Sequence, residues 1–217
     1  GWYSEFSVQE ILWDLFDSVN DGADTISLGF GPIYSAMTGG QKTTDAFATI
    51  YTFADALRAA NPSQTAAINA LLTGENIATT DIWGAAETNN GGSTTALPIY
   101  ADLVPNQSPI YVCGSGTDED RNKLGYRRYL RLNLTTAAAL TIQATGAANP
   151  SVSGSQPASD PDIAIYRRGQ LEQLSQETGA SETITQQPLA AGMHIVEVYD
   201  YELGPAPHCM TVSAASN

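Results

Sequence analysis

The chain has 217 residues, 42% of them hydrophobic, which is enough for one large or two small packed domains and too many for a disordered chain. Its 23 acidic and 9 basic residues give a net charge of −14, which argues against nucleic acid and anionic membranes as partners, because binding to phosphates requires Lys and Arg. No apolar run approaches the roughly 20 residues that cross a bilayer, so the sequence predicts no membrane span.

Helical patterns occupy the first half of the chain. The clearest predicts an amphipathic helix over residues 7–19, in which Ser7 and Glu10 match a capping box. Its apolar residues recur at helical spacing: Val8, Ile11, Leu12, Leu15, Phe16 and Val19. Because so wide a stripe has to be buried, we expect this to be the central helix of the first half. Further helices are predicted over 30–37, 44–60 and 63–72, the last two as an antiparallel hairpin.

Short strands alternate with turns in the second half, after a small and polar segment over residues 88–96. Strands are predicted over residues 110–113, 129–134, 139–144, 162–166, 182–185, 193–199 and 209–213. Within residues 129–134, Leu130, Leu132 and Leu134 share one face, which is typical of a half-buried strand in an antiparallel sheet.

The predicted fold class is therefore α+β in two parts. A helical region covers residues 1–107, including a linker over 86–107, and an antiparallel, jelly-roll-like β-sandwich covers residues 108–217. The charge is divided in the same way. Residues 1–107 hold 12 acidic and 2 basic residues, a net of −10, whereas residues 108–217 hold 11 and 7, a net of −4.

Both cysteines, Cys113 and Cys209, lie near the two ends of the predicted β domain. If the first and last strands are neighbours, the two can form a disulfide bond in an oxidising compartment. The alternative is a pair of buried free thiols. The low Lys content, with many Thr, Ser, Asn and Gly residues, favours a secreted bacterial protein.

Two segments of the second half, DPDIAIYRRG over residues 160–169 and AAGMHIVEVYD over residues 190–200, resemble the bacterial pre-peptidase C-terminal domain. That family is a small β-sandwich attached to secreted peptidases. Its usual pattern has an Asp-rich turn before one strand and a Gly before a later strand that ends in Tyr. His194 departs from this pattern, because an aromatic residue is common there. The resemblance implies a secreted, periplasmic or cell-surface location.

The first half, with GWYSEFSVQEILWDLFD over residues 1–17 and DIWGAAETNNGG over residues 81–92, resembles the region that follows the zinc site in secreted bacterial proteins of metallopeptidase type. In those proteins an HExxH helix lies upstream, and this chain has none. Because the sequence begins at Gly1 without Met or a signal peptide, we expect an excised fragment. Zinc is then expected only in the missing upstream part.

The resemblance implies a non-catalytic C-terminal portion of a secreted zinc metallopeptidase. Its helices would buttress an upstream catalytic domain, and its sandwich would serve stability, secretion or substrate contact. We then expect an exposed apolar patch on the helical half, where the upstream domain would sit. The alternative is an independent extracellular module that binds polysaccharide or protein, with calcium as a structural ion.

Calcium candidates lie in acidic turns of the second half. Asp118, Asp120 and Asn122 match the start of an EF-hand loop, although Lys123 and Tyr129 replace the required Gly and Glu. The second candidate pair is Asp160 and Asp162, to which Glu197 and Asp200 can contribute. The alternative interpretation for all of these residues is a solvated acidic turn.

Catalytic signatures are weak. Glu5 precedes the first predicted helix and could be a third zinc ligand in a longer protein, or simply an exposed residue whose charge suits the helix start. His194 and His208 can meet only if their strands are adjacent, and nothing around them completes a zinc set. No G-x-S-x-G or phosphate-binding loop is present, so we predict no catalytic residues in this chain.

Overall fold

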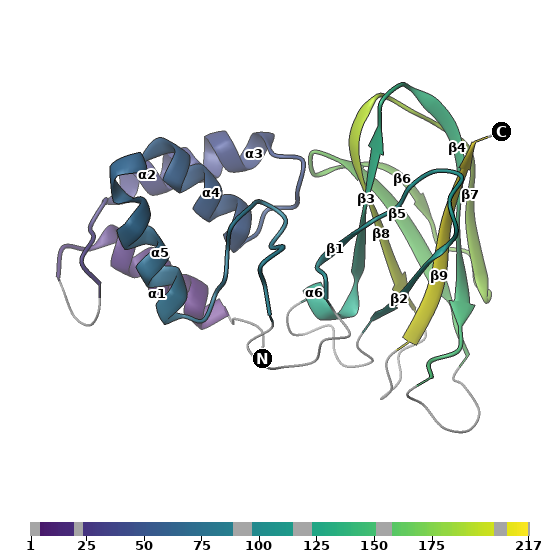
Figure 1. Ribbon diagram of the computed structural model, residues 1–217, viewed down its shortest axis with the longest axis horizontal. Coiled ribbons are helices and arrows are strands. Elements are labelled where there is room, and N and C mark those ends of the chain that lie inside the picture. The colour runs from purple at the N-terminus through teal and green to yellow at the C-terminus, as the bar shows by residue number, and fades with distance from the viewer. Residues whose placement is uncertain are drawn as a thin grey trace. The chain divides into compact units, whose positions relative to one another are not determined.

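The structure, a computed structural model, describes residues 5–19, 24–88, 97–114, 123–150, 158–201 and 208–216. The chain divides into a helical unit, Gly1–Pro98, and a β unit, Ile99–Asn217 (Figure 1). Helices come first and a two-sheet sandwich follows, so the predicted α+β class is confirmed. None of the helices in the described part of the chain is long and apolar enough to span a membrane.

The helical unit is built from short helices. These are α1 (Glu5–Phe16), α2 (Phe30–Ser35), the π-helical segment η1 (Ala36–Gly40), α3 (Gln41–Thr43), α4 (Ile50–Ala60), the 3-10 turn η2 (Pro62–Gln64) and α5 (Thr65–Gly74). The segments α2, η1 and α3 follow one another without a break, because Ala36, Gly40 and Gln41 all keep right-handed helical dihedrals. The predicted end of this helix at residue 37 is therefore wrong, because the helical segments continue through Gly39 and Gly40 to Thr43.

The central helix of this unit is α4. It contacts η1, α2, α3 and α5, and it buries most of its length. Its start at Ile50 is fixed by a reciprocal cap: the Thr49 hydroxyl accepts from the Thr52 amide, and the Thr49 amide donates to the Thr52 hydroxyl at 2.9 Å. The helix was predicted to start at residue 44, and this start is wrong, because residues 44–48 are not helical and Thr49 is the cap. Arg58 of α4 donates to the amide oxygen of Asn69 on α5 at 3.0 Å.

The first helix, α1, differs from its prediction. It begins two residues before Ser7, so Ser7 lies inside the helix and the predicted capping box is wrong. Only part of its stripe is buried: Ile11 and Leu15 are, whereas Phe16 is 46% exposed and Val19, beyond the helix end, is 61% exposed. The residues 7–19 do not form the central helix, because α4 takes that place.

The β unit is a sandwich of two sheets. Its elements are β1 (Tyr100–Asp102), β2 (Ile110–Gly114), α6 (Lys123–Tyr126), β3 (Arg128–Leu134), β4 (Ala138–Ala147), β5 (Pro161–Arg167), β6 (Gln170–Ser175), β7 (Ser181–Leu189), β8 (Gly192–Asp200) and β9 (His208–Ser216). One sheet has the order β1-β3-β8-β5-β6 and the other β2-β9-β4-β7. All seven predicted strands are present. The sequence missed β1, which pairs in parallel with β3, and the edge strand β6.

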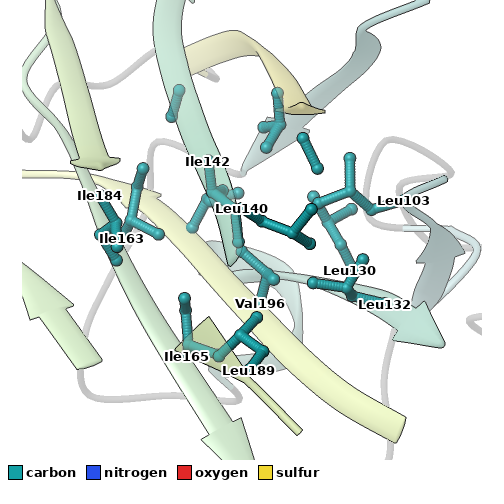
Figure 2. Close-up of a cluster of buried hydrophobic side chains, with 14 of the residues drawn as sticks. Leu103, Leu130, Leu132, Leu140, Ile142, Ile163, Ile165, Ile184, Leu189 and Val196 are labelled. Atoms are coloured by element: carbon teal, nitrogen blue, oxygen red, sulfur yellow. The ribbon is translucent and has the colours of Figure 1, made fainter. Parts of the chain in front are cut away.

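The sandwich core lies between the two sheets. Figure 2 shows Leu130 and Leu132 of β3 in one cluster with Leu140 and Ile142 of β4 and with Ile163 of β5. The alternation of Leu130, Leu132 and Leu134 that predicted a one-sided strand is thus confirmed. Burying a side chain of this size stabilises the fold by about 1.5–3 kcal/mol, so this cluster is the main source of stability in the β unit.

A disulfide bond joins Cys113 of β2 to Cys209 of β9. The two residues are direct partners in the antiparallel register of these strands. The strands that come first and last along the chain in that sheet are therefore neighbours, as the prediction required. The bond closes a loop across a sequence separation of 96 residues. The alternative of two free thiols is excluded.

Candidate functional site

Five aromatic side chains of the helical unit are exposed on α1 and α2. We call them the aromatic surface: Phe6, Trp13, Phe16, Phe30 and Tyr34. Their exposed fractions run from 46% for Phe16 to 79% for Phe6. Single exposed apolar residues are ordinary, but a group of large aromatic side chains on two adjoining helices is typical of an interaction surface.

The backbone brings the two helices together at this surface. The amides of Leu28 and Gly29 both donate to the carbonyl of Leu15, at 2.8 and 3.1 Å. Phe16 follows Leu15 and Phe30 follows Gly29, so the two aromatic residues come from chain segments that are bonded to each other.

Each helix also pairs its own rings. The centroids of Trp13 and Phe16 are 5.8 Å apart, and those of Phe30 and Tyr34 are 5.6 Å apart. Both spacings fall in the range of favourable aromatic pairs. Four of the five rings of the aromatic surface therefore pack in pairs, one pair on each helix.

Acidic side chains lie among these rings. Glu10 lies four residues after Phe6 and three before Trp13, and Asp17 lies four residues after Trp13, so the four residues follow one helix face. Glu10 is exposed, and Asp17 is half-buried. The first basic residue in the whole sequence is Lys42, in α3, so α1 and α2 carry no cation.

Apart from the aromatic surface, a group of buried acidic residues lies at one end of the sandwich. Asp160, Asp162, Glu182 and Asp200 are all buried. Asp160 accepts from the Gly179 amide at 2.8 Å, and its own amide donates to Asp200 at 2.9 Å. These carboxylates accept hydrogen bonds from the chain around them, which is how buried charges are satisfied.

Asp200 connects a serine and a histidine in this group. The Ser159 hydroxyl donates to Oδ2 of Asp200 at 2.6 Å, and Nδ1 of His208 lies 3.4 Å from the same oxygen. A serine nucleophile needs an imidazole as its base, with the carboxylate beyond the imidazole. Here the carboxylate lies in the middle, so the imidazole cannot take the proton of Ser159. The arrangement does not form a catalytic triad.

Asp162 and Tyr199 face each other across β5 and β8. Burial raises the pKa of Tyr199 to about 12, and its hydrogen bond to Asp162 adds to the increase. Burial also raises the pKa of Asp162, while hydrogen bonds from Tyr199 and Gln176 offset part of that increase. The pair is held by neighbours on the sheet, including Gln176, whose amide donates to the Tyr199 hydroxyl at 2.6 Å.

Arg127 lies beside the same tyrosine. Its guanidinium lies 4.2 Å from the centre of the Tyr199 ring and forms an ion pair with Glu197. Burial is the largest single influence and opposes its charge, but the attraction and hydrogen bond of Glu197, together with the nearby tyrosines, outweigh burial and leave the pKa of Arg127 above its ordinary value. Glu197 was expected to contribute to a calcium site, and in the structure its charge is matched by Arg127.

The two histidines do not meet. His194 belongs to β8 in the five-stranded sheet, and His208 belongs to β9 in the four-stranded sheet. His194 is fully buried, with Nδ1 2.7 Å from Glu172 and Nε2 2.8 Å from the Ala190 carbonyl. The two imidazoles therefore cannot share a zinc ion, and the ring of His194 instead links the edge strand β6 to β8.

The predicted metal ligands have different outcomes. Asp118, Asp120 and Asn122 lie outside the described residues. Asp160 and Asp162 lie close together in the polar group described above, and their assignment to calcium stays a prediction. Across the described ranges, no group of three or more His, Cys, Asp or Glu side chains has the geometry to hold a metal ion. Glu5 is exposed and accepts from the Gln9 amide at 3.0 Å.

No protein-family model and no curated protein sequence matches the chain. Among solved structures, it is similar to the pre-peptidase C-terminal domain of a collagenase from Bacillus anthracis, with 11% identity over 53% of this chain and 93% of that one and a TM-score of 0.35. A periplasmic inhibitor of g-type lysozyme from Aeromonas hydrophila matches with 13% identity over 53% of this chain and 96% of that one, and a TM-score of 0.29.

A surface-associated copper-binding protein from Methylomicrobium album BG8 matches with 11% identity over 54% of this chain and 98% of that one, and a TM-score of 0.36. Likenesses this remote transfer no ligand and no activity to the chain. A function for the chain therefore rests on the chemistry of its own residues.

Proposed function

We propose that the chain is a non-catalytic portion of a secreted protein of zinc-metallopeptidase type, in which the helical unit docks against a catalytic domain encoded upstream. The observation that carries this proposal is the aromatic surface on α1 and α2. Exposure of five large rings to water is unfavourable for the helical unit on its own, and a domain docked on them would remove the rings from water. The sequence resemblance implies the identity of that domain.

The β unit is assigned a supporting role in stability or secretion. Its core residues are packed between its own sheets, and its exposed apolar residues are Val104, Tyr111, Leu171, Leu174 and Tyr201. Its disulfide bond fits an oxidising compartment such as the periplasm or the cell exterior. Its buried carboxylates and histidines are engaged in contacts that hold the sandwich together. We therefore place the docking function in the helical unit rather than in the sandwich.

The test has two steps. The coding frame upstream of residue 1 is sequenced first, and a domain-sized extension with HExxH supports the proposal. That domain is then expressed alone and titrated with the 217-residue chain by calorimetry. We expect binding that Trp13→Ala and Phe30→Ala each weaken at least tenfold, because buried aromatic residues dominate interface energies.

The matched control is Tyr201→Ala, which removes a ring that is 66% exposed in the β unit. It is expected to leave the affinity unchanged. A frame without HExxH, or an upstream domain that does not bind the chain, would refute the proposed function.

A further inference from the structure

We infer that the aromatic surface binds a cationic amphipathic segment, with apolar side chains set against the rings and Lys or Arg set against the acidic residues between them. The inference rests on the proposed function, which makes the aromatic surface a binding surface, and it adds the chemical character of the partner that binds there. Charge complementarity on α1 is the observation that carries it.

The face of α1 alternates in character. Phe6, Glu10, Trp13 and Asp17 follow one another at helical spacing, so each ring has a carboxylate within one turn. A partner that covers the rings also brings its own groups close to Glu10 and Asp17. If those groups are apolar or acidic, Glu10 loses water without gaining a partner, and Asp17 keeps its hydrogen bond from the Val19 amide but gains no cation, which disfavours binding.

The rest of the helical unit does not neutralise these carboxylates. Residues 1–98 hold only two basic residues, Lys42 and Arg58. Arg58 donates to Asn69 and Thr79, and Lys42 belongs to α3. With no cation on α1 or α2, the potential over the rings is negative, and it favours the approach of a positively charged segment.

Phe16 and Phe30 are expected to be the centre of the contact. Phe16 directly follows Leu15 and Phe30 directly follows Gly29, so both adjoin the hydrogen bonds that join the two chain segments. Residues near the centre of an interface contribute most to affinity, and those at its rim set charge preference.

The experiment uses the full chain and two labelled synthetic peptides. One is an amphipathic helix of Leu and Lys, and the other has Glu at every Lys position. We expect the Lys peptide to bind at least tenfold more tightly, and to lose affinity when the salt concentration rises from about 0.05 M to about 0.5 M, because salt screens the attraction between charges. Equal affinities for the two peptides, or no binding of either, would overturn the inference.

Three variants locate the site. Phe30→Ala is expected to weaken binding of the Lys peptide at least tenfold, Glu10→Gln to weaken it about threefold and reduce its salt dependence, and Tyr201→Ala to change nothing. All three side chains are exposed, so the fold is expected to survive, and circular dichroism verifies this. Full affinity in Phe30→Ala, or a loss in Tyr201→Ala as large as in Phe30→Ala, would place the binding elsewhere.

The upstream domain separates this inference from the proposed function. If that domain binds the chain equally well at low and high salt, docking stands and the cationic occupant is wrong. If the Lys peptide binds at the aromatic surface and the upstream domain does not, the inference stands and the proposed function fails.

Discussion

Two adjacent glycines in the helical unit are expected to respond in opposite ways to the same substitution. Gly39 and Gly40 both lie in the π-helical segment η1. A Cβ added at Gly39 would meet nothing within 4 Å, whereas a Cβ at Gly40 would lie 2.7 Å from the Cβ of Ala56 on the central helix α4. Carbon atoms in contact are usually separated by about 3.5–4.0 Å, so α4 or η1 must move by roughly 1 Å to accept Gly40→Ala.

The magnitude follows from two opposing effects. Replacing a helical Gly with Ala stabilises by about 0.5–1 kcal/mol, because the unfolded chain loses freedom. Overpacking costs about 1–3 kcal/mol, because neighbours must shift. Gly39→Ala is therefore expected to raise the free energy of unfolding by about 0.5–1 kcal/mol, and Gly40→Ala to lower it by about 1 kcal/mol.

Urea unfolding followed by tryptophan fluorescence measures this difference in the helical unit, to which Trp2, Trp13 and Trp83 all belong. The exchange variant Gly40→Ala/Ala56→Gly is the control, because it removes the Cβ atom on α4 that the added methyl group would strike, and the coupling between the two sites is expected to be favourable. If Gly40→Ala is as stable as Gly39→Ala, the close packing of η1 on α4 is wrong.

Three predictions concern the β unit. The double variant Cys113→Ala/Cys209→Ala is expected to lose up to about 4.7 kcal/mol of stability in the chain-entropy model for a loop of roughly 100 residues, measured by hydrogen exchange of the strands, and a loss below about 1 kcal/mol would contradict it. Gly114→Ala places a Cβ 2.3 Å from the backbone oxygen of Tyr126 and is expected to lower the free energy of unfolding by about 1–3 kcal/mol, measured by thermal unfolding. The control Gly31→Ala, in α2 of the helical unit, places its Cβ with nothing within 4 Å and is expected to be neutral or stabilising. The raised pKa of Tyr199 means that the unfolded tyrosine ionises first, so its contribution to stability is complete below pH 10 and is lost as the pH rises toward about 12. Tyr199→Phe is expected to reduce the loss of stability between about pH 10 and pH 12, and Tyr201→Phe is the control. If the dependence of stability on pH is unchanged in Tyr199→Phe, the contribution of Tyr199 is contradicted.

The strands that could be predicted are those with local patterns. The alternation of Leu130, Leu132 and Leu134 marks a strand with one buried face, and such a signal needs no knowledge of the partner strand. The two strands that the sequence missed, β1 and β6, lack such an alternation. Residues 170–175 are mostly exposed at the edge of their sheet, and residues 100–102 are only three long and pair with a strand far along the chain.

The helix errors have tertiary causes. Two adjacent glycines usually favour a helix end, but Gly40 stays in the helix because its missing side chain lets η1 approach Ala56. The start of α4 depends on the pairing of Thr49 with Thr52, which the apolar spacing in this segment does not reveal. Similarly, the sequence could not show whether His194 and His208 lie on neighbouring strands, because nothing local indicates that the chain changes sheets between them.

The exposed aromatic residues of the helical unit come from two helices whose chain segments are hydrogen-bonded to each other, and this grouping supports the proposed docking role. Phe16 and Val19 continued the stripe of the first predicted helix and were expected in the core. Phe16 is the last residue of the helix and Val19 lies beyond its end, and both are exposed, whereas Ile11 and Leu15 are buried. In the sandwich, by contrast, the inward residues of both sheets meet one another. Phe16 is thus both a residue mispredicted as core and a member of the exposed aromatic surface, and its departure from the pattern lies where a partner is expected to bind.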